Sequence, residues 1–129
     1  MFTVEQIKAA HAKVKSGADF PAYIQDITAL GVTGYSTYVM DGHTDYNGQN
    51  SYHIHSPAKY PAQVIASISN MHAFKHYLSI HQQGQTDYPT FCRQAAETGV
   101  EKWVVNMQQM TCSYYDLAGN TMLVEKIPG

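Results

Sequence analysis

The chain has 129 residues, of which 44% are hydrophobic and only 14% are charged. This length suggests one compact domain with enough apolar side chains to form a core. Eight basic and ten acidic residues give a net charge of −2 with histidine neutral, which argues against a protein that binds nucleic acid by neutralising phosphates. The same balance argues against a polybasic membrane-surface binder. We therefore expect neither nucleic acid nor membrane among the partners.

The first residues of the chain and the two cysteines bear on the cellular compartment in which the protein is expected. No basic stretch followed by an apolar segment occurs near Met1, so we expect no signal peptide. No apolar run approaches the roughly 18 residues of a membrane span. Cys92 and Cys112 form neither a CxxC pair nor a zinc-ligand spacing. We expect a cytoplasmic protein whose cysteines are free thiols.

Two helices are predicted at the start of the chain. The first begins after Thr3, which forms a capping box with Gln6, and is expected to end at Gly17. Its apolar face comprises Val4, Ile7, His11 and Val14. The second begins at Asp19, whose carboxylate can accept from first-turn N–H groups, and ends at Gly31. Its buried stripe comprises Phe20, Tyr23, Ile24 and Ile27.

Three short strands are predicted next. Residues 35–40 alternate, so that Tyr35, Thr37 and Val39 lie on one side. Asp41-Gly42 and Asn47-Gly48 are turn signals. These turns delimit further strands at 44–46 and 52–55.

The second half is predicted to have the same order of elements. A connection over 57–68 contains a further short strand at Val64–Ile68. Two helices follow, one from a Ser69 cap to Gly84 and one from an Asp87 cap to Gly99. Their apolar positions are Met71, Phe74, Leu78 and His81 in the first, and Tyr88, Phe91, Cys92 and Ala95 in the second. Strands at 103–107, 111–115 and 122–127 end the chain.

The two halves also resemble each other in sequence. A shift of 68 residues over 19–46 aligns Asp19 with Asp87, Pro21 with Pro89, Gly31 with Gly99, Val32 with Val100 and Tyr46 with Tyr114. Cys92 falls at the place of Ile24, which favours a buried, inert thiol. Because short turns favour antiparallel neighbours, we predict an α+β fold of two pseudo-repeated ααβββ halves whose antiparallel sheet packs against helices. The single domain 1–129 would comprise halves at 1–56 and 69–129.

The seven histidines are the main candidates for chemistry. His53 and His55 on a strand would share a face about 7 Å apart, with Thr44 or His43 beside them. Two imidazoles and a third donor would suit zinc or another transition metal, but the same pattern fits two solvent-facing side chains. His72 and His76 would share a solvated helix face. His11 and His81 replace aliphatic residues, which favours packed histidines with hydrogen-bond partners; the alternative is that both line a cleft between the halves.

The remaining patterns specify no reaction. The chain has no GxSxG elbow, no Cys–His signature and no glycine-rich phosphate loop, so we assign no catalytic residue, cofactor or metal. Aromatic residues recur at matching places in both halves and could pack the helices onto the sheet or line a cleft between the halves. Packing is favoured for Tyr23, Phe91, Tyr35 and Trp103. The candidates for a ligand or interaction surface are His43, His53, His55, Tyr38 and Tyr115.

Six runs of residues together carry a family resemblance, and they are Glu5–His11, Lys15–Pro21, Asp41–Tyr46, Ser56–Pro61, His81–Gly84 and Glu101–Val105. They resemble the YdfO/YbcV-like family of short enterobacterial and prophage-encoded proteins, a domain of unknown function whose members are sometimes labelled phage envelope proteins. The resemblance extends over nearly the whole chain. It implies a cytoplasmic α+β protein and no particular activity or catalytic residues.

Three functions are consistent with these observations. The leading hypothesis is a non-enzymatic accessory protein that binds another protein or associates with itself, because tyrosine is enriched at interfaces. The second is a small-molecule-binding protein that uses an aromatic cleft between the repeats. The third is a metal enzyme built on His43, His53 and His55.

Overall fold

A computed structural model describes residues 2–15 and 19–127. The first half contains helices α1 (Val4–His11) and α2 (Phe20–Leu30), then strands β1 (Val32–Tyr38), β2 (Thr44–Gly48) and β3 (His53–Ser56), with a short 3-10 turn over Gln49–Ser51. The second half contains α3 (Met71–Gln82), α4 (Tyr88–Glu97), β4 (Val100–Asn106), β5 (Thr111–Asp116) and β6 (Thr121–Lys126). The fold class is therefore α+β, as predicted.

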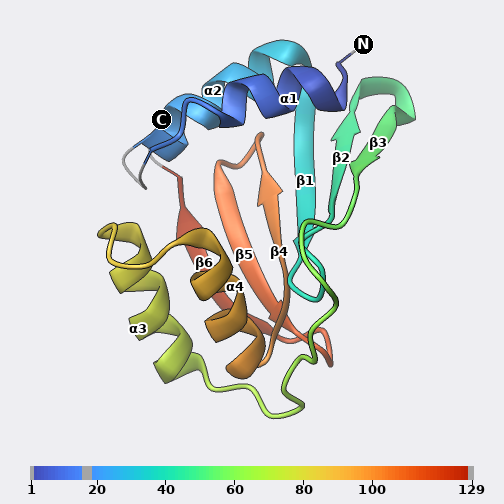
Figure 1. The fold of residues 1–129 in the computed structure, drawn as a ribbon. Coiled ribbons are helices and arrows are strands. Elements are labelled where there is room, and N and C mark those ends of the chain that lie inside the picture. The colour runs from blue at the N-terminus through green and yellow to red at the C-terminus, as the bar shows by residue number, and fades with distance from the viewer. Residues whose placement is uncertain (1, 16–18, 128–129) are drawn as a thin grey trace.

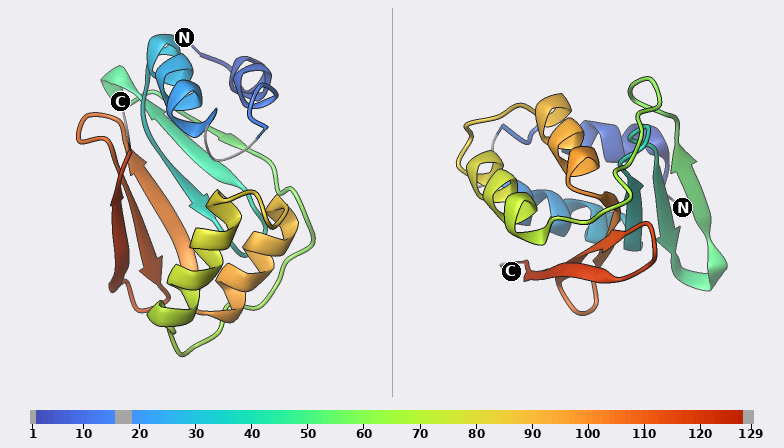
Figure 2. Two further views of the ribbon diagram at one scale, coloured as in Figure 1. Left: turned by 90° about the vertical axis from the view of Figure 1, so that its left-hand side faces the viewer. Right: turned by 90° about the horizontal axis from the view of Figure 1, so that it is seen from below.

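All six strands form one antiparallel sheet in the order β3-β2-β1-β4-β5-β6. The pairs α1–α2 and α3–α4 lie on the same face of this sheet (Figures 1 and 2). Within the described residues, the two halves meet in the sheet only through β1 and β4, whose register places Ser36 opposite Val104. Whether the halves share a sheet could not be deduced from the sequence, and they do.

The core lies between the helices and the covered face of the sheet. Alternating strand residues enter it, which confirms the predicted inward positions Tyr35, Thr37 and Val39 and their neighbours Trp103, Val105 and Met107. The helices contribute buried residues at helical spacing, namely Ile7, Tyr23, Ile24, Ile27, Phe74, Leu78, Phe91 and Cys92. The opposite face of the sheet carries no helix in Figures 1 and 2, and we refer to it as the open face.

The predicted helix boundaries are confirmed in part. Thr3 and Gln6 form the capping box, and Gly31 ends α2 with φ of 109°. The Asp19 carboxylate accepts from the backbone N–H of Lys15 rather than from the first turn of α2. Helix α1 ends at His11, because the following turn is closed by i→i−3 bonds from Lys13 and Val14; the predicted end at Gly17 lies outside the described residues.

Two other boundaries differ from prediction. Asn70, not Ser69, caps α3, since its side chain accepts from the N–H of Ala73. The turn predicted at Asn47-Gly48 lies further on, because Asn50 and Ser51 adopt positive φ values of 58° and 64° while Gly48 remains extended. Residues 49–52 therefore connect β2 and β3, close to the gap of 47–51 that the predicted strands leave.

The strand predicted at Val64–Ile68 is wrong. The N–H groups of Gln63 and Ala66 donate to the carbonyls of Met40 and Ala96, which do not belong to a neighbouring strand. Val64 and Ile68 are 90% and 81% exposed, so these two apolar side chains contribute little to the core. The segment crosses from β3 to α3 as an irregular connection.

Gly99 provides a test of how closely this connection packs. A Cβ atom at Gly99 would lie 2.8 Å from Cα of Ser69, whereas one at Gly84 would meet nothing within 4 Å, and both residues have positive φ. We expect Gly84→Ala to lower the free energy of unfolding by about 1–2 kcal/mol through backbone strain alone. Gly99→Ala should lower it by a further 1–3 kcal/mol or so, because the backbone of Ser69 must move. Urea unfolding followed by circular dichroism measures both, and equal losses would contradict the close approach.

Candidate functional site

Strand register arranges the open face in rows of side chains that run across the sheet. Tyr38 pairs with Lys102, and Lys102 pairs with Tyr115. The backbone N–H of Tyr38 donates to the carbonyl of His43, so His43 lies at the end of the same line. We call His43, Tyr38, Lys102 and Tyr115 the tyrosine row. Three of the five residues predicted for an interaction surface thus come together.

Ring contacts hold the tyrosine row in place. The rings of His43 and Tyr38 are stacked, with centroids 4.5 Å apart and planes 7° apart. The ammonium of Lys102 lies 5.7 Å from the centroid of Tyr38 and 5.9 Å from that of Tyr115, distances at which a cation is attracted to the face of an aromatic ring. Among residues 2–15 and 19–127, no carboxylate forms an ion pair with Lys102. The row therefore presents a positive charge flanked by two phenols.

The turn that ends β1 orients His43. Asp41 accepts from both the backbone N–H and the Nδ1 atom of His43. The backbone hydrogen bond from His43 lowers the pKa of the Asp41 carboxyl, because it stabilises the ionised form. This agrees with the structural role that the sequence predicts for the Asp41-Gly42 turn, and it fixes the ring that stacks on Tyr38.

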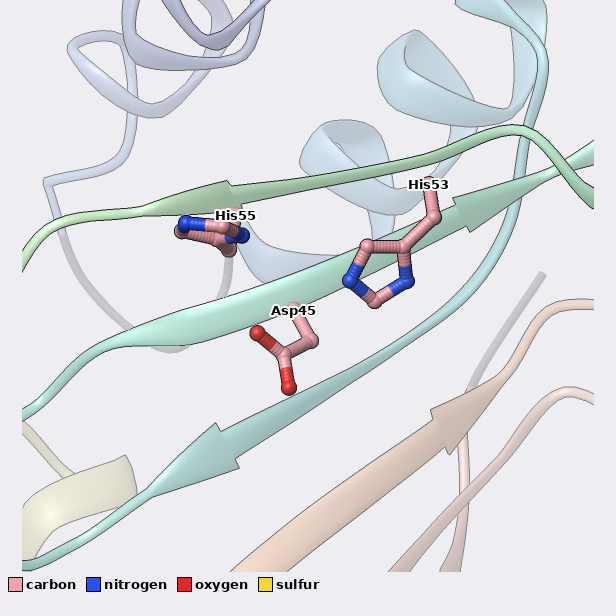
Figure 3. A group of neighbouring side chains, drawn as sticks. All are labelled: Asp45, His53 and His55. Carbon is pink, nitrogen blue, oxygen red and sulfur yellow. The ribbon is translucent and has the colours of Figure 1, made fainter.

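A second group of side chains lies at the β2–β3 edge of the same face. Asp45 pairs with His55, and Asn47 pairs with His53. Ligand atoms of Asp45, His53 and His55 all lie within 4.8 Å of one another (Figure 3). His53 and His55 are exposed, as predicted for solvent-facing rings, while Asp45 is half-buried. We call these three residues the His–Asp group.

The predicted neighbours of the two histidines are wrong. Thr44 is buried, pairs with Ser56 and is hydrogen-bonded to the Thr37 hydroxyl, so it faces the core. His43 belongs to the tyrosine row. The third residue is Asp45, which the register of the β2–β3 hairpin places opposite His55. Alternation along 44–46 could have placed Asp45 on the outer face, but only the register places it beside His55.

The packing predictions hold for three of the other histidines and fail for His11, which is exposed. His72 and His76 are exposed on α3. His81 is stacked on Phe91 at 4.4 Å and its Nδ1 contacts the carbonyl of Thr86 at 3.1 Å, which confirms a packed histidine with a partner. His11 is exposed by surface area, but its ring meets that of Tyr23 edge-on at 5.3 Å.

Most of the recurring aromatic residues fill the core and not a cleft. Buried members are Tyr23, Tyr35, Tyr46, Phe91, Trp103 and Tyr114. The two pockets described on the surface, one lined by Tyr60 and Arg93 and one by Gln49 and Gln108 among others, include none of these residues. Of the recurring aromatic residues named here, Tyr38 and Tyr115 alone reach the open face, because they lie at outward positions of β1 and β5.

Both cysteines are buried free thiols, as predicted. Burial raises the pKa of the Cys92 thiol and raises that of Cys112 to about 12. A thiol whose pKa lies well above neutral pH is protonated and a poor nucleophile. Neither cysteine therefore contributes reactive chemistry.

The packed histidines predict a pH dependence of stability. Burial lowers the pKa of His81 from its ordinary value of 6.5, so the unfolded chain binds the proton more tightly than the folded one. The stability that the neutral ring provides is complete above pH 6.5 and is lost as pH falls through the lowered pKa. We expect urea unfolding to show a fall in the free energy of unfolding between about pH 7.5 and about pH 5.5. His81→Gln should show a smaller fall, and an unchanged fall would contradict this role.

Comparison with known proteins shows the family of the chain. Within residues 2–15 and 19–127, no helix has the length and apolar character needed to cross a bilayer. No curated protein matches the sequence. A family model described as "Protein of unknown function (DUF1398)" matches residues 8–126, which is most of the chain. The chain therefore belongs to this family of proteins of unknown function.

Proposed function

We propose that this protein is a non-enzymatic accessory protein that binds an acidic segment of another protein on the open face of its sheet. The observation that carries the proposal is the position of Lys102 between Tyr38 and Tyr115. A carboxylate placed above this row would receive a charge-assisted hydrogen bond from the ammonium, and the two phenol hydroxyls could donate to it as well.

The composition of the open face indicates the kind of partner. Three of the five side chains in the next row of the open face are polar, and the row consists of Asp45, Ser36, Val104, Ser113 and Val124. Obligate dimers bury larger and more apolar surfaces, whereas separable partners use polar ones with aromatic anchors. The open face therefore favours a transient protein partner over an obligate dimer with a second copy of the chain.

We also propose that the chain is a single domain, 1–129, built from an internal repeat. The same order of two helices and three strands occurs in both halves, and β1 and β4 have the ranges 32–38 and 100–106, which differ by 68 residues. Ser36 is paired with Val104, its counterpart at the same shift. This register would place a pseudo-twofold axis between the two residues, which supports a duplicated ααβββ unit with a connection at 57–68.

The more specific family relationship is also part of the proposal. Sequence runs such as Asp41–Tyr46 and Ser56–Pro61 support a YdfO/YbcV-like, prophage-related protein. Free, buried cysteines are compatible with action in the reducing cytoplasm. An accessory role is consistent with a site that has a charge and two phenols but no nucleophile.

An acetylated hexaglutamate peptide tests the interaction. We expect saturable shifts in the amide NMR signals of Tyr38, Lys102 and Tyr115 as the peptide is added. Lys102→Met keeps most of the side-chain length and removes the charge. It should weaken the Kd about tenfold or more, because a hydrogen bond to a charged group contributes about 1.5–3 kcal/mol. Lys75→Met, on the exposed side of α3, is the matched control and should leave the Kd unchanged.

Two outcomes would contradict the proposal. One is that the peptide shifts amide NMR signals over the whole surface and binds the Lys102→Met variant with the same Kd as the wild type. The other is a concentration-dependent dimer, seen by sedimentation, that Lys102→Met dissociates, because it would assign the open face to a second copy of the chain.

A further inference from the structure

We propose that the His–Asp group, Asp45, His53 and His55, binds a divalent transition-metal ion at the β2–β3 edge of the open face. The three side chains project from the same face of the two strands, with Asp45 between the two rings in the view of Figure 3. The site goes beyond the binding of an acidic segment, because it uses other residues and a different chemistry.

Backbone pairing holds the three residues in place. Asp45 lies directly opposite His55 across the antiparallel pair, and His53 is two residues from His55 on the same strand. Side chains two residues apart share a face, and directly opposite residues are near neighbours. The proximity of the group is therefore fixed by the ladder and does not depend on a mobile loop.

The present spacing lies close to that of a metal site. Zinc binds imidazole nitrogen and carboxylate oxygen at about 2.0–2.2 Å, so two ligands of a tetrahedral ion lie roughly 3.4 Å apart. The ligand atoms lie within 4.8 Å of one another. Rotation of exposed side chains can close this difference while the strands stay in place.

Asn47 provides a supporting contact for one ring. Its side-chain oxygen lies 3.2 Å from Nδ1 of His53. Because a carbonyl oxygen only accepts hydrogen bonds, Nδ1 of His53 carries the proton in this contact and Nε2 keeps its lone pair. Metal-binding histidines commonly donate the other ring N–H to a carboxylate or carbonyl, which sets the tautomer and the ring orientation. Asn47 is thus a positioning residue for the proposed site.

The donor set selects the class of ion. Two imidazoles favour zinc, copper, iron or nickel over calcium and magnesium, which prefer oxygen ligands. Three protein ligands leave at least one coordination position for water or another group, as in open rather than closed zinc sites. The exposed position of both rings keeps that fourth position accessible from solvent.

Zinc titration of the untagged, chelator-treated protein tests the proposal by calorimetry. We expect one zinc ion per chain. Asp45→Asn, His53→Ala and His55→Ala should each weaken the Kd at least about tenfold, and Asn47→Ala should weaken it by about tenfold or more. Because both rings and Asn47 are exposed and Asp45→Asn keeps the size of the side chain, the metal-free variants should melt at the wild-type temperature, which separates loss of a ligand from loss of folding.

The exposed pair His72 and His76 on α3 is the control, since two histidines four residues apart share a helix face. The double variant His72→Ala/His76→Ala should retain the wild-type Kd for zinc. The proposal is overturned if this double variant loses zinc binding, if Asp45→Asn binds zinc as the wild type does, or if no binding tighter than about 1 mM is detected. None of these outcomes depends on whether the hexaglutamate peptide binds.

Discussion

The pairing of β1 with β4 is the contact on which the rest of the structure depends. Within the described residues, it is the one strand pair that joins residues before the 57–68 connection to those after it. Its register, with Ser36 opposite Val104, aligns the two three-stranded halves of the sheet. It also brings both helical pairs to one face (Figure 1), so that Tyr35 and Trp103 enter the same core. A shift of one residue would turn these side chains to the open face.

The same pairing creates the open face as a continuous surface. Lys102 comes from the second half of the chain and Tyr38 from the first, and they are neighbours only because β4 lies beside β1. Tyr115 reaches Lys102 from the other side through the β4–β5 pairing. The positive charge with its two aromatic flanks is therefore a property of the assembled sheet and belongs to neither half alone.

Local sequence patterns predict the helices and the inward faces of the strands. The site residues that these patterns miss are those whose neighbours come from non-local strand pairing. Gly31 and Gly99 mark the ends of α2 and α4 through their positive φ, and alternation suffices to orient Trp103 and Val105. The exact position of the β2–β3 turn could not be predicted, because Asn50 and Ser51 adopt positive φ without glycine. Asp45 was missed because the register of the two strands, which local patterns do not specify, decides that His55 is its neighbour. Lys102 was missed for the same reason, because its partners come from strands distant in sequence.

The two proposed sites share a face, and their electrostatics are therefore coupled. Neighbouring residues on one face of a strand are about 7 Å apart and adjacent strands about 4.8 Å apart, so Asp45 lies roughly 8–9 Å from Tyr38 in the tyrosine row. This is close to the Debye length at physiological ionic strength. A bound dication would reverse the sign of the charge at the β2–β3 edge, because it adds two positive charges to the single negative charge of Asp45. Metal binding would then strengthen the attraction of the open face for an acidic segment, and by linkage such a segment would strengthen metal binding by the same factor. Salt screens this coupling more strongly than it affects the metal–ligand bonds themselves. Raising the ionic strength should therefore weaken the coupling between the two sites while metal binding itself is largely retained.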